Sequence, residues 1–216
     1  MCGRYTLRAK LNLLLSQFAA EMAEAVEWEP RYNIPPTATV LAVRQNQQRR
    51  ELVTLRWGLI PSWAKDAKLA QINARADTVA TKPMFRAAYK KRRCLILADG
   101  YYEWLREGKE KQPFFYEVDH GQPFAMAGLW ESWVPPDQPA PIESCTIITT
   151  DANELASDVH NRMPVILNPA DYDAWLTGAE VPLVPFAAQR MSVRPVDRFI
   201  NKAGNEGAQC LSAPLF

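Results

Sequence analysis

Cys2 is the residue whose chemistry depends most on its place in the chain, because it directly follows Met1. Once Met1 is removed, Cys2 carries a free α-amine and a β-thiol, and together they form a 1,2-aminothiol. An α-amine has a pKa of about 8, so an appreciable fraction is unprotonated at neutral pH and can attack an aldehyde. The neighbouring thiol then closes the Schiff base to a five-membered thiazolidine ring. The sequence therefore predicts a covalent trap for an aldehyde, with an incidental second-position cysteine as the alternative.

The residues after Cys2 support this interpretation. Gly3 lets a ligand approach the backbone closely, and Arg4 offers a guanidinium to a phosphate group. These two neighbours make an incidental cysteine a weaker explanation than it would be for Cys2 alone.

Further motifs place polar side chains beside predicted strands, where functional sites are usually built. They span residues 73–77, 99–104, 149–153 and 160–164. Glu103 is suited to proton transfer, although a strand-end carboxylate in a salt bridge is an equal alternative from the sequence. His160 is suited to the same task, and its alternative is a histidine hydrogen-bonded where a loop meets a strand.

The composition is that of a folded globular protein. Of 216 residues, 48% are hydrophobic and 23% are charged, and 25 basic against 24 acidic side chains give a net charge of +1. Any affinity for nucleic acid must therefore come from a local arrangement of Arg and Lys. The cysteines form no C-x-x-C pair and the two histidines do not supply ligand spacing, so we expect no metal site and no cofactor. Cys94 and Cys145 lie in apolar runs and are expected to be buried thiols.

Neither the apolar core of a signal peptide nor a run of about 20 apolar residues is found, so we expect a cytoplasmic protein without a membrane span. The length favours one domain over residues 1–216.

The apolar pattern predicts short helices and a fold rich in antiparallel sheet. Strands are expected at residues 40–44, 52–57, 94–98, 114–118, 124–128, 145–149 and 165–167. Helices are expected near residues 11–18, 84–90 and 171–176, the last with Asn168 as its N-cap. Residues 119–122 have the composition of a hairpin turn, residues 135–139 that of an exposed loop, and residues 90–93 that of a solvated helix end.

Seven motifs in a fixed order carry a resemblance to a known family. They are MCGR at residues 1–4, PRYNIPPT at 30–37, WGLIPSW at 57–63, NAR at 73–75, ADGYYEW at 98–104, AGLWE at 127–131 and HNRMPVIL at 160–167. Each motif alone is weakly specific, but all seven in this order are strongly specific. The chain thereby resembles the SOS-response-associated peptidase (SRAP) family from Met1 to about Asn201. Tyr101 stands where Phe is commoner and Pro35 where Ala is usual, and neither position carries acid, base or nucleophilic chemistry.

The resemblance implies a single α+β SRAP domain with a barrel-like core of antiparallel sheet and flanking short helices. It also implies a protein that removes its own Met1 and crosslinks Cys2 to abasic sites in single-stranded DNA, and that associates with the nucleoid when bound there. By the matching motifs, the expected catalytic residues are Cys2, Asn73, Glu103 and His160. The expected DNA-binding residues are Gly3, Arg4, Pro36, Trp63, Arg75, Thr149 and Arg162.

Individual roles follow from the chemistry of these side chains. Opening the abasic sugar ring requires proton transfer, which we assign to His160 and Glu103, and Glu103 would also serve any reversal of the crosslink. Asn73, which both donates and accepts, would orient the Cys2 amine. Trp63 and Pro36 would stack against or wedge between bases, although packing within the protein is as good an explanation for each.

Two other functions fit parts of the sequence. The first is a cysteine peptidase acting on other proteins, with Cys2 as nucleophile and His160 as base. The second is a noncatalytic module that binds any single-stranded DNA. For the preferred function we expect a monomer whose partner is single-stranded DNA containing abasic sites.

Overall fold

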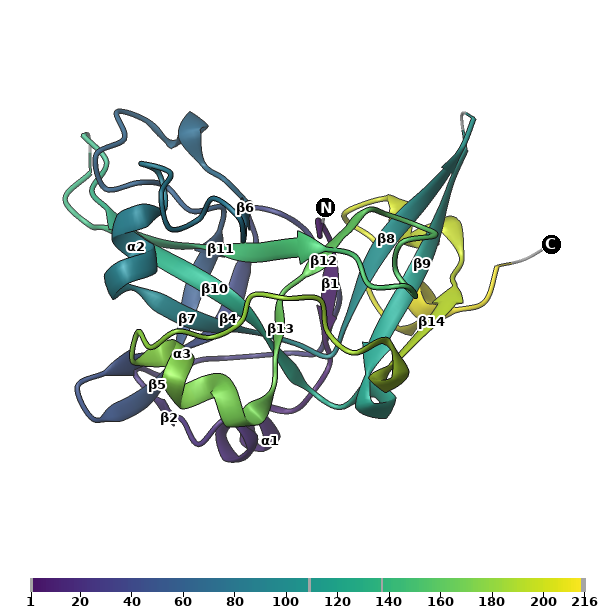
Figure 1. Ribbon diagram of the computed structural model, residues 1–216, viewed down its shortest axis with the longest axis horizontal. Helices are drawn as coiled ribbons and strands as arrows, with labels where there is room; N and C mark the ends of the chain where they lie inside the picture. The colour runs from purple at the N-terminus through teal and green to yellow at the C-terminus, as the bar shows by residue number, and fades with distance from the viewer. Residues whose placement is uncertain (1, 109, 137, 215–216) are drawn as a thin grey trace.

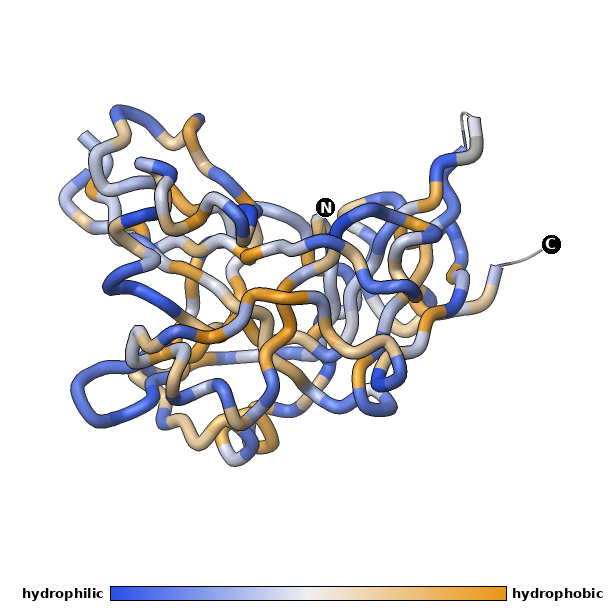
Figure 2. The backbone as a smooth tube through the Cα atoms, viewed as in Figure 1, coloured by the Kyte–Doolittle hydropathy of each residue, from blue (hydrophilic) through white to orange (hydrophobic). Residues whose placement is uncertain are grey.

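The structure is a computed structural model that describes residues 2–108, 110–136 and 138–214. It consists mostly of strands, arranged in two sheets, with a few short helices on the outside (Figure 1). The predicted α+β class is therefore confirmed. Figure 2 shows that hydrophobic stretches run through the middle of the molecule, while the peripheral turns are mostly hydrophilic.

The larger sheet closes on itself to form a barrel. Its ring consists of β4 (Thr39–Asn46), β5 (Arg49–Trp57), β7 (Arg93–Ala98), β10 (Phe124–Trp133) and β11 (Ile142–Asp151). Strands β5, β4, β7, β10 and β11 pair antiparallel in that order, and β11 then pairs with β5 in parallel. This last pairing, which sets Cys145 opposite Trp57, joins the ends of the ring. The barrel-like core is thus confirmed, although one contact of the ring is parallel.

Short strands extend this ring. They are β2 (Glu21–Met22), β6 (Asn73–Arg75), β12 (Arg162–Pro164) and β13 (Ile166–Leu167). β6 runs parallel to β11, and β12 pairs antiparallel with the same strand. β6 and β12 therefore both pair with the C-terminal part of β11, which brings residues 73–75 and 162–164 together.

The second sheet has the order β14-β9-β8-β1-β3, with every pairing antiparallel. The strands are β1 (Tyr5–Leu7), β3 (Arg31–Ile34), β8 (Gly100–Glu107), β9 (Glu110–Val118) and β14 (Met191–Pro195). β8 follows β7 after one residue, Asp99, so the chain passes directly from the barrel into this sheet.

One carboxylate fixes the first strand to that crossing point. Asp99 is 3% exposed and accepts hydrogen bonds from the Thr6 hydroxyl at 2.6 Å and from the backbone N–H groups of Arg8 and Ala9. The next residue, Gly100, is required by close packing, because a Cβ there would lie 2.2 Å from the Phe115 ring. These contacts hold β1 in place and so position the residues that precede it.

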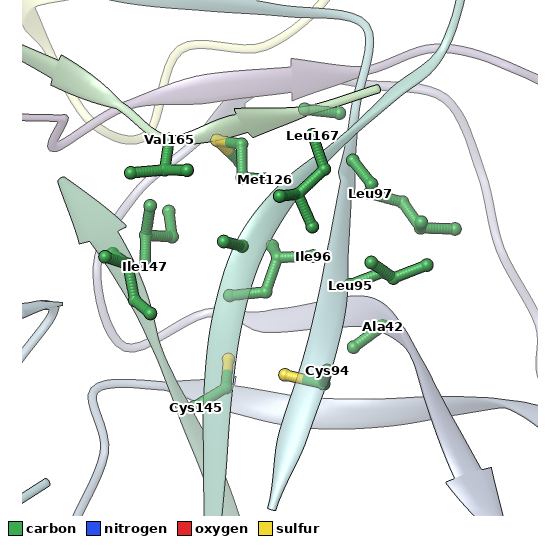
Figure 3. Close-up of a cluster of buried hydrophobic side chains, with 14 of the residues drawn as sticks. Ala42, Cys94, Leu95, Ile96, Leu97, Met126, Cys145, Ile147, Val165 and Leu167 are labelled. Atoms are coloured by element: carbon green, nitrogen blue, oxygen red, sulfur yellow. The ribbon is translucent and has the colours of Figure 1, made fainter. Parts of the chain in front are cut away.

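The core includes side chains from both sheets. The main buried cluster contains Tyr5 of the second sheet together with barrel residues such as Ile96 and Met126. Figure 3 shows Ile96 between Met126 at one end of the cluster and Cys94 and Cys145 at the other, and the two cysteines are buried free thiols as predicted.

The three predicted helices are present. They are α1 (Leu11–Gln17), α2 (Arg86–Lys91) and α3 (Tyr172–Leu176). Leu14 of α1 and Phe18 after it are fully buried, as their helical spacing predicts. Short 3₁₀ turns complete the fold: η1 (Ala67–Leu69), η2 (Asp119–Gly121), η3 (Pro169–Asp171), η4 (Ala188–Arg190), η5 (Arg198–Asn201) and η6 (Ala208–Leu211).

Two local predictions are wrong in detail. The turn at residues 119–122 exists as η2, with His120 at φ 61°, but the strands on either side belong to different sheets and form no hairpin. Asn168 stands at the N-cap position of η3, but its side chain makes no capping bond and accepts from Arg190 instead.

A third prediction fails at Arg93, which is 8% exposed and does not belong to a solvated helix end. Its guanidinium lies 4.4 Å from the ring centre of Tyr89 and 4.5 Å from that of Trp175. It also donates to the backbone oxygens of Tyr89 and Ala179. The aromatic faces and carbonyl groups replace the water that this charge would otherwise need.

Candidate active site

An open pocket of about 750 Å³ lies beside the segment that leads into β1. Its lining consists of Gly3, Arg4, Glu103, Trp104, Leu105, Arg106, Lys111, Val159, His160 and Asn201. Figure 1 shows that this segment runs between β6 on one side and the β8–β9 hairpin on the other. Four predicted site residues, Gly3, Arg4, Glu103 and His160, thus meet at one pocket, and Cys2 directly precedes Gly3.

Asn73 holds the backbone of Cys2. Its Nδ2 donates to the Cys2 carbonyl oxygen over 2.9 Å. Asn73 is the first residue of β6 and stands in register with Ile147 of β11, so the barrel wall fixes its position. The structure therefore brings the predicted positioning residue to the predicted nucleophile.

The Cys2 side chain is fully buried, and this burial, together with the charge of Glu103, raises the pKa of its thiol. The thiol therefore stays protonated at neutral pH. A cysteine peptidase needs the opposite, because its attacking group is a thiolate with a lowered pKa.

Glu103 lies in the interior of β8, not at a strand end as the salt-bridge alternative supposed. It is 5% exposed, and burial raises the pKa of its carboxyl group above the usual 4.5. A carboxyl group whose pKa is moved toward neutrality can both give and take a proton at physiological pH.

His160 has a defined tautomer. Its Nδ1 accepts a hydrogen bond from the backbone N–H of Arg162 over 3.0 Å. Burial is the main cause that lowers the pKa of His160 from 6.5, so the ring is neutral at pH 7. Because Nδ1 accepts, the proton of the neutral ring lies on Nε2. The hydrogen bond expected at a loop-to-strand junction is thus present, and it leaves Nε2–H as a donor.

Arg162 and Thr149 form a buried pair beside His160. Arg162 is 8% exposed, and its Nη2 donates to the Thr149 carbonyl oxygen at 2.6 Å and to the Thr149 hydroxyl at 2.7 Å. Thr149 itself is 1% exposed. Its hydroxyl therefore orients the Arg162 guanidinium and presents almost no surface of its own.

Arg75 is exposed at the end of β6 and forms an ion pair with Asp77. Its Nε lies 3.0 Å from Oδ1 of Asp77, and its Nη2 lies 2.5 Å from Oδ2. The Asp77 carboxylate thus binds the same N–H groups of the guanidinium that a phosphate would bind.

Arg4 is held on several sides. Its Nη1 donates to the side-chain oxygen of Asn33 and to the carbonyl oxygen of Ile200, and its guanidinium lies 5.7 Å from the ring centre of Trp104. Asn33 is fully buried and donates in turn to the carbonyl oxygens of Ile200 and Lys202. Sequence reasoning did not single out Asn33, although it lies in one of the seven motifs, PRYNIPPT at residues 30–37.

Trp63 and Pro36 lie elsewhere. Trp63 is 59% exposed in the loop between β5 and η1, whereas Pro36 is half-buried just after β3. Neither lines the pocket formed by the described residues. Because so large an aromatic ring is exposed, packing within the protein is a poor explanation for a tryptophan at position 63.

Two negative findings concern only the residues that the structure describes. These residues contain no group of three or more His, Cys, Asp or Glu side chains that could hold a metal ion. No helix among them is long and apolar enough to cross a membrane.

Fold and site together define a mixed α+β protein in which an amide holds Cys2 next to a pocket lined by a buried carboxyl group and a neutral imidazole. The chain belongs to the SOS response associated peptidase (SRAP) family, whose model matches residues 1–203.

Curated relatives share most of their length with this chain. The abasic site processing protein YoaM of Bacillus subtilis is 39% identical, over 99% of this chain and 98% of its own. The abasic site processing protein YedK of Escherichia coli is 30% identical, over 98% and 99% of the two chains. A crystal structure of a Bacteroides thetaiotaomicron protein superimposes with a TM-score of 0.88 at 26% identity, covering 99% of this chain and all of the other.

Proposed function

We propose that this protein processes abasic sites in single-stranded DNA by forming a thiazolidine between the sugar aldehyde and Cys2. Relatives named abasic site processing proteins support the substrate class. The observation that carries the proposal is the 2.9 Å hydrogen bond from Asn73 to the Cys2 carbonyl, which fixes the future amino terminus beside the pocket of Glu103 and His160.

The reaction begins with hydrolysis of the Met1–Cys2 peptide bond, carried out by the protein itself, which frees the Cys2 amine. The amine then attacks C1′ of the ring-opened sugar, and loss of water gives the imine. The thiol sulfur adds to the imine carbon, and its proton passes to the nitrogen. The condensation thus forms one C–N and one C–S bond and releases one water molecule.

Burial of Cys2 favours this order of events. Since the thiol is protonated, the amine is the stronger nucleophile at the outset, and the thiol reacts only once it is held next to an imine carbon. The same burial opposes the rival peptidase reaction, in which sulfur attacks first.

Glu103 and His160 divide the proton transfers. Glu103, with its raised pKa, gives a proton to the departing oxygen of the sugar and takes one from the attacking amine. His160, neutral and protonated at Nε2, donates a hydrogen bond to the sugar oxygen during ring opening. Reversal of the crosslink uses Glu103 by microscopic reversibility.

The DNA strand is bound as a single strand by a protein monomer. Arg4, Arg75 and Arg162 contact its phosphates, and Thr149 acts through Arg162. Trp63 stacks on a base, Pro36 lies beside the strand, and Gly3 permits the close approach of the sugar.

Intact mass spectrometry before and after mixing with abasic single-stranded DNA tests the proposal. We expect a protein that has lost Met1 and gains the mass of the oligonucleotide minus one water. The Cys2→Ala variant should lose this adduct while keeping salt-sensitive binding.

Other outcomes point to the rival functions. Multiple turnovers on unrelated peptides would favour the peptidase. Binding that is unchanged by an abasic site, without adduct, would favour the noncatalytic module.

A further inference from the structure

Two exposed cations line the pocket without a role in the chemistry described above. Arg106 is near the end of β8 and Lys111 near the start of β9, and they stand directly opposite each other in the antiparallel pairing. They belong to the β8–β9 hairpin, which lies on the other side of the segment leading into β1 from β6 (Figure 1).

Backbone hydrogen bonds of neighbouring residues show whether Arg106 and Lys111 form a hydrogen-bonded or a non-hydrogen-bonded pair. The backbone N–H of Tyr102 donates to Arg4, so the even-numbered residues of β8 turn their backbone groups away from β9. The carbonyl of Pro113 accepts from Val196, so the odd-numbered residues of β9 turn theirs away from β8. Arg106 and Lys111 therefore form a non-hydrogen-bonded pair, in which the Cα atoms are about 4.5 Å apart and side chains come closest.

Two like charges in this position repel each other. Among the side chains that the structure describes, which do not include that of Glu107, no ion pair is found for either cation, and the nearby Glu110 carboxylate pairs with Arg198. The repulsion is thus left uncompensated by the described side chains, and an anion bound between the two would relieve it.

The edge of β8 offers further donors at this place. β1 covers β8 only as far as Tyr102, because Arg4 makes the last bond to that strand. By the alternation just described, the N–H groups of Trp104 and Arg106 face this open edge, and no backbone partner for them is found in the described part of the chain. Cationic side chains beside outward N–H groups form a surface suited to phosphate oxygens.

We propose that Arg106 and Lys111 bind a phosphate of the DNA strand on the side of the abasic nucleotide opposite to Arg75 and Arg162. The site rests on the proposed function, since it takes the strand to be held across the pocket. It gives the strand cationic contacts on both sides of the lesion, so that the abasic sugar is stretched over Gly3.

Binding of an oligonucleotide that carries a tetrahydrofuran analogue of the abasic sugar tests the site. The analogue lacks the aldehyde, so only noncovalent affinity is measured. We expect the Arg106→Gln/Lys111→Gln variant to bind about tenfold more weakly. The slope of log K against log salt concentration should fall by about 0.7 for each phosphate that the variant no longer neutralises.

Two control variants separate a phosphate site from general charge. The Lys10→Ala/Arg49→Ala variant loses the same charge from exposed positions outside the pocket and should bind as the wild type does. The Arg106→Lys/Lys111→Arg variant keeps both cations and should restore most of the affinity. The glutamine variant should melt no lower than the wild type, because it relieves a repulsion.

Oligonucleotides with nucleotides on only one side of the analogue locate the phosphate. The weakening of affinity should persist for one of the two and vanish for the other. An equal weakening for both, or an equal weakening in the Lys10/Arg49 variant, would overturn the site. Wild-type affinity in the glutamine variant, alongside normal adduct formation with true abasic DNA, would refute the phosphate site alone. Absence of the adduct in the wild type would refute the proposed function instead.

Discussion

Asn73 donates its side-chain amide to the carbonyl oxygen of Cys2, and this single bond of 2.9 Å ties the start of the chain to the barrel. Asn73 belongs to β6, whose position is set by its parallel pairing with β11. Cys2 precedes β1, whose position is set by Asp99. The bond therefore connects both sheets to Cys2, the residue that we propose reacts with the sugar.

The Asn73→Ala variant should form the crosslink about 5- to 150-fold more slowly, since removing a hydrogen bond to a positioned group costs about 1–3 kcal/mol. Asn73→Asp should be at least as slow, because a carboxylate would face the Cys2 carbonyl oxygen. Single-turnover kinetics with saturating abasic DNA measure this rate. Affinity for the tetrahydrofuran analogue is the control and should be unchanged in both variants.

Glu103→Gln should stabilise the protein at neutral pH. A carboxyl group whose pKa is raised in the folded state binds its proton more tightly there than in the unfolded chain. The free energy of unfolding therefore falls as pH rises from the ordinary value of 4.5 through the folded value, and the whole loss is present once the pH exceeds the folded value. Glutamine carries no charge and avoids the loss.

Thermal unfolding at pH 7.5 and at pH 4 measures this effect. Each kcal/mol gained should raise the melting temperature by about 2–4 °C at the higher pH, with no gain at the lower. Glu131→Gln is the matched control, because it removes the buried partner of Arg92 and should lower the melting temperature. A melting temperature for Glu103→Gln below that of the wild type at pH 7.5 would contradict the assigned pKa shift.

Trp63→Ala should weaken DNA binding without harming the fold. The ring is 59% exposed, so its removal exposes little core, whereas stacking on a base is worth about 1–3 kcal/mol. Affinity for single-stranded DNA should fall about 5- to 150-fold by that energy. Leu13→Ala, which truncates an exposed side chain of α1 away from the pocket, should leave affinity unchanged. Equal affinities for Trp63→Ala and the wild type would remove Trp63 from the DNA path.

Much of the fold could be predicted from local patterns. The barrel strands can be recognised because their residues either alternate between apolar and polar or form apolar runs of sufficient length. The spacing of Leu14 and Phe18 identifies α1. These elements predict a sheet-rich fold with short helices, and the family resemblance adds the α+β class. Closure of the barrel could not be predicted, because the pairing that sets Cys145 opposite Trp57 joins segments 88 residues apart, and no local pattern encodes it.

The sequence names candidate site residues but does not give the geometry in which they lie. The motifs identify Glu103 and His160 as candidates, yet neither the burial that shifts their pKa values nor the tautomer of His160 can be read from a sequence. For Arg93 the sequence pattern itself is misleading. A run of basic residues suggests a solvated helix end, whereas the rings of Tyr89 and Trp175 explain why Arg93 is buried.

Asp77→Asn should tighten binding to single-stranded DNA. The Asp77 carboxylate engages the Arg75 guanidinium through Oδ1 and Oδ2, so a phosphate must displace it before Arg75 can bind in the same geometry. The hydrogen bond to Arg75 lowers the pKa of Asp77 to about 2, so the ion pair is fully formed between pH 5 and pH 8. Its release by substitution should raise affinity about two- to fivefold at low salt, and the gain should shrink as salt screens both contacts. Asp173→Asn, which breaks an exposed ion pair with Arg50, removes the same charge and separates release of Arg75 from the change in net charge. Equal gains in the two variants, measured by fluorescence anisotropy over a range of salt concentrations, would show that Asp77 acts only through net charge.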